Sequence, residues 1–408
     1  MVNQLNRRHL LRGLDGIFRQ MLLFMCVVVE TTAQPAPPSA RLIEDWRLRA
    51  EDHNFSRIPR IYVGPRNVTV VPLRDETRLA LFDSTGQRFG SVGRKGSGPG
   101  EFLDAQGVIV RWKADTMWVH ESMQRRTSYF APNAKLLRTV ADTRIERIQL
   151  LDGRKSGPAS AVSPMAIQGD GTVTAVWHQV PMNAHQQEYG TEAYMIRIVP
   201  GAAPRTVLRL PFPIDERMVM TAGGGRSPVP FTFTPEIAVA GAGDRVGQLQ
   251  SHYTPRDSGS YTVSLFTANG DTLFARKFAY RGVPVSKAER DSAIASLAVI
   301  IKEASPQEIR QLQAIAAVKM PSIHAEAISI VIGLDDTVWI GHRQTAAGQN
   351  VTVLDNAGAI IGNVLVPPRS RLQQASRTQI WMTEKDDNDL TSIVHYRVTG
   401  LPCGKARC

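Results

Sequence analysis

The chain has 408 residues, of which 43% are apolar, 21% charged and only 7% aromatic, and its formal net charge is +11. This apolar content excludes a disordered chain, and the length suits one large domain or two ordinary ones. The 32 glycines and 25 prolines follow no triplet period, which excludes collagen and favours short strands joined by tight turns. Lys and Arg form no run of five or more, so the clustered charge typical of nucleic-acid-binding proteins is absent.

Residues 1–33 have the pattern of a secretory signal peptide. A basic region that includes Arg7 and Arg8 precedes the apolar run Met21–Val29, and small residues end at Ala33, so cleavage before Gln34 is predicted. The apolar run is shorter than the roughly 20 residues that span a bilayer, and no transmembrane segment is predicted. We therefore expect an exported protein, periplasmic or extracellular, with the general and twin-arginine routes both open.

Two of the three cysteines lie in the C-terminal tail, residues 403–408. Because exported proteins meet an oxidising compartment, a disulfide between Cys403 and Cys408 is predicted. No histidine neighbours them, which argues against a zinc site.

Two signatures recur along the chain and indicate an internal repeat. The first is an acidic or glycine turn followed by a short strand, as in Asp115–Val119, Gly171–Val176, Asp244–Leu249 and Asp336–Ile340. The second is an apolar residue that enters a turn containing Gly or Asn, as in Phe82–Gly86, Phe130–Ala134, Phe266–Gly270 and Leu354–Gly358. Gly and Asn tolerate the positive φ of hairpin turns, so two hairpins are predicted for each repeat.

Four-stranded repeats at this spacing are typical of propeller blades. The sequence predicts an all-β fold, a six-bladed β-propeller of four-stranded antiparallel blades over residues 34–402, with seven blades as the alternative. The predicted blades cover residues 60–95, 105–143, 163–211, 233–280, 322–366 and 376–399. The last blade is short, and Leu42–Arg49 is expected to supply its missing strand and close the ring. Trp118, Trp339 and Trp381 recur at equivalent positions and are predicted to lie in blade cores.

Residues 284–320 interrupt the repeat between blades four and five. Ser286–Glu289 matches a capping box, and Ser305–Glu308 starts a second helix with Pro306 at its first position. Apolar residues follow both at helical spacing, so a two-helix insertion is predicted. It is expected to cover part of the propeller surface, with a lid or a docking element as the alternative.

A glycine-rich loop, Val92–Phe102, joins the first two predicted blades. A nucleotide site is not favoured, because the loop leads into a strand and lacks the Gly-Lys-Ser/Thr that opens a helix in phosphate-binding loops. The string Gly96–Phe102 after a Phe-Asp-x-x-Gly hairpin resembles the six-bladed NHL-like propellers of exported bacterial proteins, most of them uncharacterised. The resemblance implies a closed ring, with Gly96, Gly98, Pro99, Gly100 and Phe102 in a structural loop near the axis. It implies no established reaction and no catalytic residue.

The repeat alignment places polar side chains on the face formed by inter-blade connections and by the loops between second and third strands. This candidate ligand face contains Arg94, Lys95, Glu101, His120, Glu121, His178, His252, His324 and His342. Imidazoles and carboxylates are metal ligands and acid–base groups, but histidines are also common at strand ends in purely structural roles. No Gly-x-Ser-x-Gly nucleophile motif is present.

The sequence therefore predicts an exported β-propeller that acts as a binding or scaffolding module for a protein or glycan. Because fold does not fix function, two alternatives stay open. One is a hydrolase that acts on a lactone, ester or glycan at an axial site with a divalent metal. The other is a structural protein of the envelope without a ligand.

Overall fold

The computed structural model describes residues 38–53, 55, 58, 60–121, 123–124, 126–141, 160–167, 172–179, 192–199, 202, 205–211, 218–220, 226–232, 236–240, 244–253, 258–300 and 305–402. The predicted signal peptide and both cysteines of the tail lie outside these residues. No helix within the described ranges is long and apolar enough to cross a membrane. The predicted domain limits stay a prediction.

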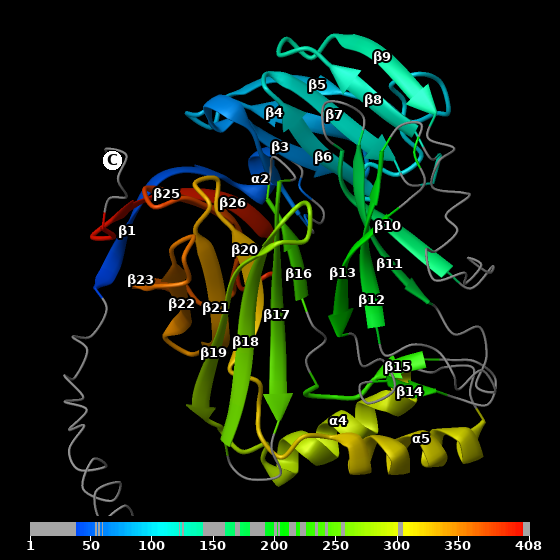
Figure 1. The fold of residues 1–408 in the computed structure, drawn as a ribbon, viewed down its shortest axis with the longest axis vertical. Helices are drawn as coiled ribbons and strands as arrows, with labels where there is room; N and C mark the ends of the chain where they lie inside the picture. The colour runs from blue at the N-terminus through cyan, green and yellow to red at the C-terminus, as the bar shows by residue number, and fades with distance from the viewer. Residues whose placement is uncertain are drawn as a thin grey trace, which may run out of the picture. The chain divides into compact units, whose positions relative to one another are not determined.

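Strands predominate in the described chain and form antiparallel sheets in a propeller-like arrangement, with few helices (Figure 1). Four sheets have four strands each, in chain order within the sheet. The first contains β2 (Tyr62–Val63), β3 (Thr69–Leu73), β4 (Arg78–Phe82) and β5 (Arg88–Val92). The second contains β6 (Val108–Lys113), β7 (Thr116–Glu121), β8 (Arg126–Phe130) and β9 (Leu136–Ala141). The third contains β10 (Ser160–Ile167), β11 (Val173–Gln179), β12 (Glu192–Ile198) and β13 (Arg205–Pro211). The fourth contains β16 (Glu236–Val239), β17 (Arg245–Tyr253), β18 (Ser258–Thr267) and β19 (Thr272–Arg281).

An eight-stranded sheet, in the order β20-β21-β22-β23-β1-β26-β25-β24, contains both ends of the described chain. One half contains β20 (Ala327–Ile332), β21 (Val338–Thr345), β22 (Gly348–Leu354) and β23 (Ile360–Val366). The other half contains β24 (Ser370–Ala375), β25 (Gln379–Lys385), β26 (Thr391–Thr399) and β1 (Ser39–Leu48). Only two parallel residue pairs join the halves, Ser39 with Asn363 and Ala40 with Val364. Within each half the strands form an antiparallel meander of the same kind as the other four sheets.

The predicted closing strand is confirmed. β1 pairs antiparallel with β26 from Arg41 opposite Thr399 to Leu48 opposite Ile393, so the N-terminal strand completes a sheet built from the C-terminal end of the chain. This pairing covers the backbone groups along one side of β26 that would otherwise form an exposed edge.

The predicted hairpin turns are confirmed between the third and fourth strands of four sheets. Gly86, Ala134, Gly270 and Gly358 have φ of 82°, 66°, 94° and 80°, the left-handed conformation that such turns need. At the turn after β4, Oδ1 of Asp83 accepts hydrogen bonds from the backbone N–H of Thr85 and of Gln87, at 2.9 and 3.0 Å. This local Asp hydrogen bonding explains why an acidic residue follows Phe82.

Each sheet packs its apolar side chains against the sheets formed by the preceding and following segments of the chain. Trp118, Trp339 and Trp381 are 2%, 0% and 0% exposed, so the prediction that they lie in the core is confirmed. Val338, Ile340 and Leu354 of the eight-stranded sheet share a cluster with residues of the β16–β19 sheet, which joins two sheets through one apolar layer.

The interruption between β19 and β20 is helical, as predicted. α4 (Lys287–Ile300) begins after Ser286, which forms the predicted capping box with Glu289, and α5 (Pro306–Lys319) begins after Ser305, whose side chain accepts from the Glu308 N–H. Leu297 and Leu312 are buried against Val229, whereas Ile315, expected on the same apolar face, is 41% exposed. The remaining short elements are α2 (Ala50–His53), the 3-10 turn η1 (Pro65–Asn67) and the hairpin β14 (Met218–Met220) with β15 (Arg226–Pro228).

The closing strand is held by aromatic contacts and a hydrogen bond around His395 of β26. The imidazole lies between Trp46 and Trp381, with ring centroids 5.1 and 4.6 Å away, and its Nδ1 is 3.1 Å from Oδ2 of Asp45. Burial lowers the pKa of His395 below 6.5, although Asp45 opposes this. Nε2 is buried and has no hydrogen-bond partner in the part of the chain that the structure describes, which suits a neutral imidazole whose proton sits on Nδ1.

A pH dependence of stability follows. Because the folded pKa is depressed, the unfolded chain binds more protons as pH falls below about 6.5, and the stability contributed by neutral His395 is lost there. We expect the unfolding midpoint to fall more steeply between pH 7 and pH 5 in the wild type than in His395→Gln, measured by thermal denaturation. Parallel curves for the two proteins would contradict this account.

Candidate functional site

The glycine loop between β5 and β6 folds around the carboxylate of Glu101. Oε2 of Glu101 accepts the Gly98 N–H at 2.7 Å, and Oε1 accepts from Nε of Arg94 at 2.7 Å. These two contacts, the backbone one first, lower the pKa of Glu101. Gly96 has φ of 153°, and a Cβ there would lie 2.1 Å from Oε2 of Glu101, so only glycine fits. Arg94 and Glu101 therefore neutralise each other within the loop.

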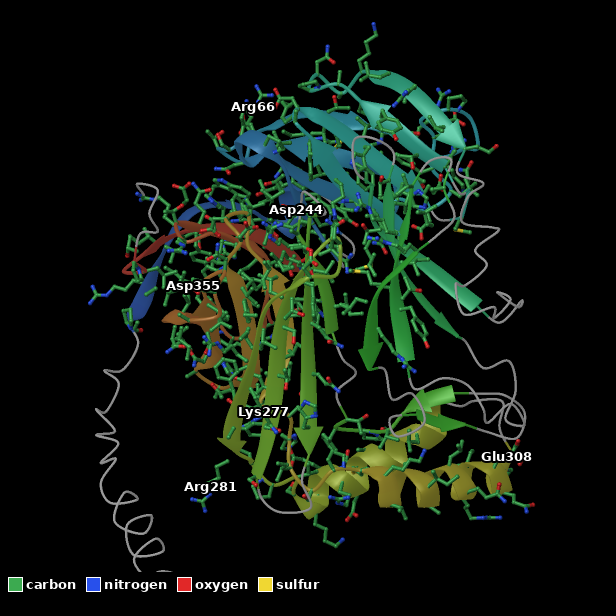
Figure 2. The ribbon with its side chains drawn as sticks, in the orientation of Figure 1. Arg66, Asp244, Lys277, Arg281, Glu308 and Asp355 are labelled. Atoms are coloured by element: carbon green, nitrogen blue, oxygen red, sulfur yellow. The ribbon has the colours of Figure 1, made fainter. Side chains whose placement is uncertain are left out.

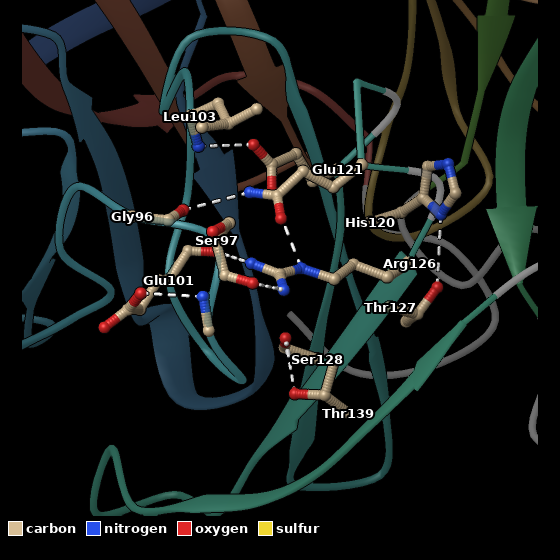
Figure 3. A network of polar contacts seen from close by, with 12 residues as sticks. Gly96, Ser97, Glu101, Leu103, His120, Glu121, Arg126, Thr127, Ser128 and Thr139 are labelled. Atoms are coloured by element: carbon tan, nitrogen blue, oxygen red, sulfur yellow. Dashed lines mark hydrogen bonds and ion pairs between the residues drawn. The ribbon is translucent and has the colours of Figure 1, made fainter.

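A second set of contacts, the Arg126 brace, ties the loop to the β6–β9 sheet (Figure 3). Arg126 of β8 donates to the carbonyl oxygens of Ser97, at 2.6 Å, and of Glu101. Its Nε lies 3.8 Å from Oε2 of Glu121, whose Oε1 accepts the Leu103 N–H at 2.5 Å. Glu121 is only 2% exposed, so its charge is shared between a backbone donor and one guanidinium.

Phe102 anchors the end of the loop in the apolar core. Its side chain is 1% exposed and belongs to a cluster that contains residues of β3, β4, β6, β7 and β8. The loop therefore lies in the packing between two sheets. Lys95, by contrast, is exposed, and its backbone bridges Phe102.

Three of the predicted histidines have the same local role in three different sheets. Each lies on the second strand and places a ring nitrogen next to a threonine hydroxyl on the third strand. The pairs are His120 with Thr127 at 3.1 Å, His252 with Thr262 at 3.1 Å, and His342 with Thr352 at 2.8 Å. A histidine at this position therefore joins neighbouring strands of its own sheet.

The other two predicted histidines do not extend this set. His324 precedes β20, with Nε2 at 3.3 Å from Oε1 of Glu289 on α4 and an edge contact to Phe231. For His178 the structure gives the backbone on β11, and its side chain lies outside the described atoms.

His342 also forms the most enclosed pair with a carboxylate on the predicted face. Its Nδ1 lies 3.3 Å from Oε1 of Glu326, and this contact lowers the pKa of Glu326. Tyr261 of the neighbouring sheet stands edge-on to His342, and burial raises the pKa of its hydroxyl. A histidine–carboxylate pair such as His342 and Glu326 has the groups needed for proton transfer. A metal site needs more than these two ligands. Within the described ranges, no three His, Cys, Asp or Glu residues group to hold a metal ion.

A polar cavity of about 620 Å³ lies where the first strands of the sheets converge. Its walls come from β2, β6, β16, β20 and β24, from Met165 of β10, and from the adjoining residues Arg60, Ile61 and Thr232. Of the residues predicted for the ligand face, none of the eight with described side chains lines it, and neither does the glycine loop. Phe102 and Arg126 hold the glycine loop between two sheets, and its expected place near the axis stays a prediction.

Four charged residues line the cavity: Arg60, Arg111, Glu236 and Arg371. Sequence reasoning missed all four, because they come from separate segments and match no local motif. One signal was present. Arg111 interrupts the apolar run Val108–Trp112 of a predicted strand, and a charged residue inside a buried strand indicates a special environment.

Comparisons with known proteins give weak structural likenesses. No family model matches the chain, and no curated protein matches it in sequence. A DUF4221-family protein from Bacteroides vulgatus is 11% identical with a TM-score of 0.46, covering 88% of this chain and 99% of its own. A protein described as exported, from Bacteroides fragilis, is 11% identical with a TM-score of 0.44, covering 89% and 96%. The calcium-binding protein regucalcin from Agrobacterium tumefaciens is 9% identical with a TM-score of 0.37, covering 90% and 96%.

The Arg126 brace gives a stability prediction. In Arg126→Met the buried Glu121 carboxylate loses its counter-charge, and breaking a buried pair in this way costs about 3–5 kcal/mol. We expect a loss of that size in the free energy of unfolding, measured by urea denaturation. The control Lys135→Met removes an exposed charge in the neighbouring turn and should change stability by less than about 0.5 kcal/mol. Equal behaviour of the two variants would contradict the brace.

Proposed function

We propose that the chain is an exported, six-bladed β-propeller that binds a glycan, or the glycan part of a larger partner, in the cavity where its first strands converge. Six antiparallel meanders support the blade count, if the eight-stranded sheet is taken as two blades joined by their two parallel pairs. Export rests on the signal pattern of residues 1–33.

The cavity carries this proposal, because residues from the first strand of every meander line it. Its volume of about 620 Å³ falls within the range of roughly 300–1,000 Å³ that is usual for ligand pockets. Its lining residues include apolar ones such as Val110 and Ile332 and polar ones such as Thr232, Gln373 and Gln374. A mixed wall of this kind suits a ligand with both hydroxyl groups and apolar faces, as sugars have.

Binding without turnover is the function that these residues support best. Three of the five predicted histidines are bonded to threonines within their own sheets, and none of these three lines the cavity. The alternative, a metal-dependent hydrolase of lactones, esters or glycans, has no group of three ligand side chains to support it in the part of the chain described. A divalent metal therefore has no role in the proposal.

The test is a screen of the mature chain against soluble oligosaccharides and a glycan array, followed by hydrogen–deuterium exchange with each ligand that binds. We expect slower exchange at β6, β16, β20 and β24, with no change at the outer strands β9 and β19. Protection confined to the glycine loop or the helices, release of a product, or the absence of any bound glycan would each contradict the proposal.

A cavity-filling pair of variants adds a second measurement. Ala238 lines the cavity, so Ala238→Phe should weaken binding by about tenfold or more. Ala275 is exposed on β19, three strands away in the same sheet, so Ala275→Phe should leave binding unchanged. The exchange experiment on the wild type decides the question if Ala238→Phe does not fold.

A further inference from the structure

The charges that line the cavity are unbalanced. Three guanidiniums, of Arg60, Arg111 and Arg371, share it with the single carboxylate of Glu236. In a concave, partly dehydrated site, such an excess of one sign concentrates ions of the other sign. The cavity therefore favours an anionic ligand.

Arg111 is the most unusual member of the group. The residue is 9% exposed, its guanidinium donates to the Val110 carbonyl oxygen at 2.9 Å, and its Nε is buried without a hydrogen-bond partner among the described residues. Burial lowers its pKa to about 10, which still leaves the guanidinium charged at neutral pH. Buried arginines are normally paired with a carboxylate, but Arg111 forms no ion pair with any residue in the described ranges.

Arg60 and Arg371 present free guanidiniums to the same space. Both are exposed, and neither forms a hydrogen bond or an ion pair with the residues that the structure describes. Arg60 acts electrostatically on both Arg111 and Glu236, and Arg371 acts on Glu236, so the four charges share one electrostatic environment.

Glu236 does not neutralise these arginines by direct contact. Its Oε2 accepts the Ile330 N–H at 3.2 Å, which ties the carboxylate to the backbone of β20. Burial raises its pKa, and Arg371 and Arg60 act in the opposite direction. A carboxylate in this position repels a group of high negative charge density and accepts hydrogen bonds from hydroxyl groups, so it favours single carboxylates carried on hydroxyl-bearing rings.

We propose that the cavity binds a carboxylate-bearing sugar, a uronic acid unit, through the guanidiniums of Arg60 and Arg371. This inference rests on the proposed glycan-binding function and specifies its ligand class. Guanidinium and carboxylate match each other in planar, two-point hydrogen bonding, which lysine cannot provide. Arg111 adds a fixed positive field from the wall, and Glu236 selects against groups that carry two negative charges, such as phosphate monoesters.

The experiment measures the affinity of the mature chain for digalacturonate, for an uncharged digalactose and for inorganic phosphate by isothermal titration calorimetry at fixed salt. Digalacturonate is expected to bind at least tenfold more tightly than either of the other two. Arg60→Met and Arg371→Met should each weaken digalacturonate binding by roughly tenfold to a hundredfold, because hydrogen bonds to charged groups contribute about 1.5–3 kcal/mol.

Two further variants test whether the charge inside the cavity determines the affinity for digalacturonate. Arg281→Met removes an equal charge from the exposed end of β19, away from the cavity-lining residues, and should leave binding unchanged (Figure 2). Glu236→Gln keeps an acceptor for the Ile330 N–H but removes the negative charge, so it should tighten digalacturonate binding. This gain cannot arise from loss of folding, and it keeps the proposal testable if an arginine variant is unstable.

The outcomes separate this inference from the proposed function. If digalactose binds as tightly as digalacturonate and the arginine variants have no effect, the cavity binds neutral glycans and only the uronate assignment fails. If inorganic phosphate binds most tightly, the ligand is a phosphate and the assignment is overturned. If no sugar binds, both proposals fail.

Discussion

The pairing of β1 with β26 is the contact on which the rest of this fold depends. Strands near the two ends of the chain meet along seven residue pairs, and β1 also touches β23 through two parallel pairs. Without β1, the strand β26 would expose its backbone groups, and the β24–β26 unit would lack its fourth strand. His395 and the two tryptophans around it add side-chain contacts to this backbone pairing. The first strands that line the cavity keep their places only while the sheets around them are held together.

The polar groups on the predicted ligand face contribute mainly to the packing of the sheets. Glu101 organises its own loop, and Arg126 ties that loop to the next sheet. Histidines on second strands are bonded to threonines on third strands in three sheets. Repetition of the same bond at equivalent positions indicates a structural role, because a binding site needs different groups that converge. Histidine at a strand end is therefore weak evidence for catalysis in a repeat protein.

The cavity has the opposite character, because none of its three guanidiniums forms an ion pair within the described ranges. A buried guanidinium without a carboxylate lowers the free energy of unfolding of the unliganded protein. An apolar side chain in place of Arg111 would therefore give a more stable core. Arg60 and Arg371 stand in the same space without ion pairs, while elsewhere arginines such as Arg47 and Arg369 pair with nearby acids. Unsatisfied charge concentrated in a concave site, on strands that are otherwise apolar, is the physical reason for assigning ligand binding there.

The amino-acid sequence by itself determined the repeating strands, the turns after Phe82 and Leu354, the closing strand and both helix starts. These features depend on alternation, on turn residues and on capping side chains, all of which act over a few neighbouring positions. Only the tertiary structure decided what the polar residues do. Whether His342 binds a ligand or Thr352 depends on the neighbouring strand, and the approach of Arg60, Glu236 and Arg371 depends on segments separated by more than a hundred residues. No local spacing encodes such a meeting, because it exists only after the sheets have packed.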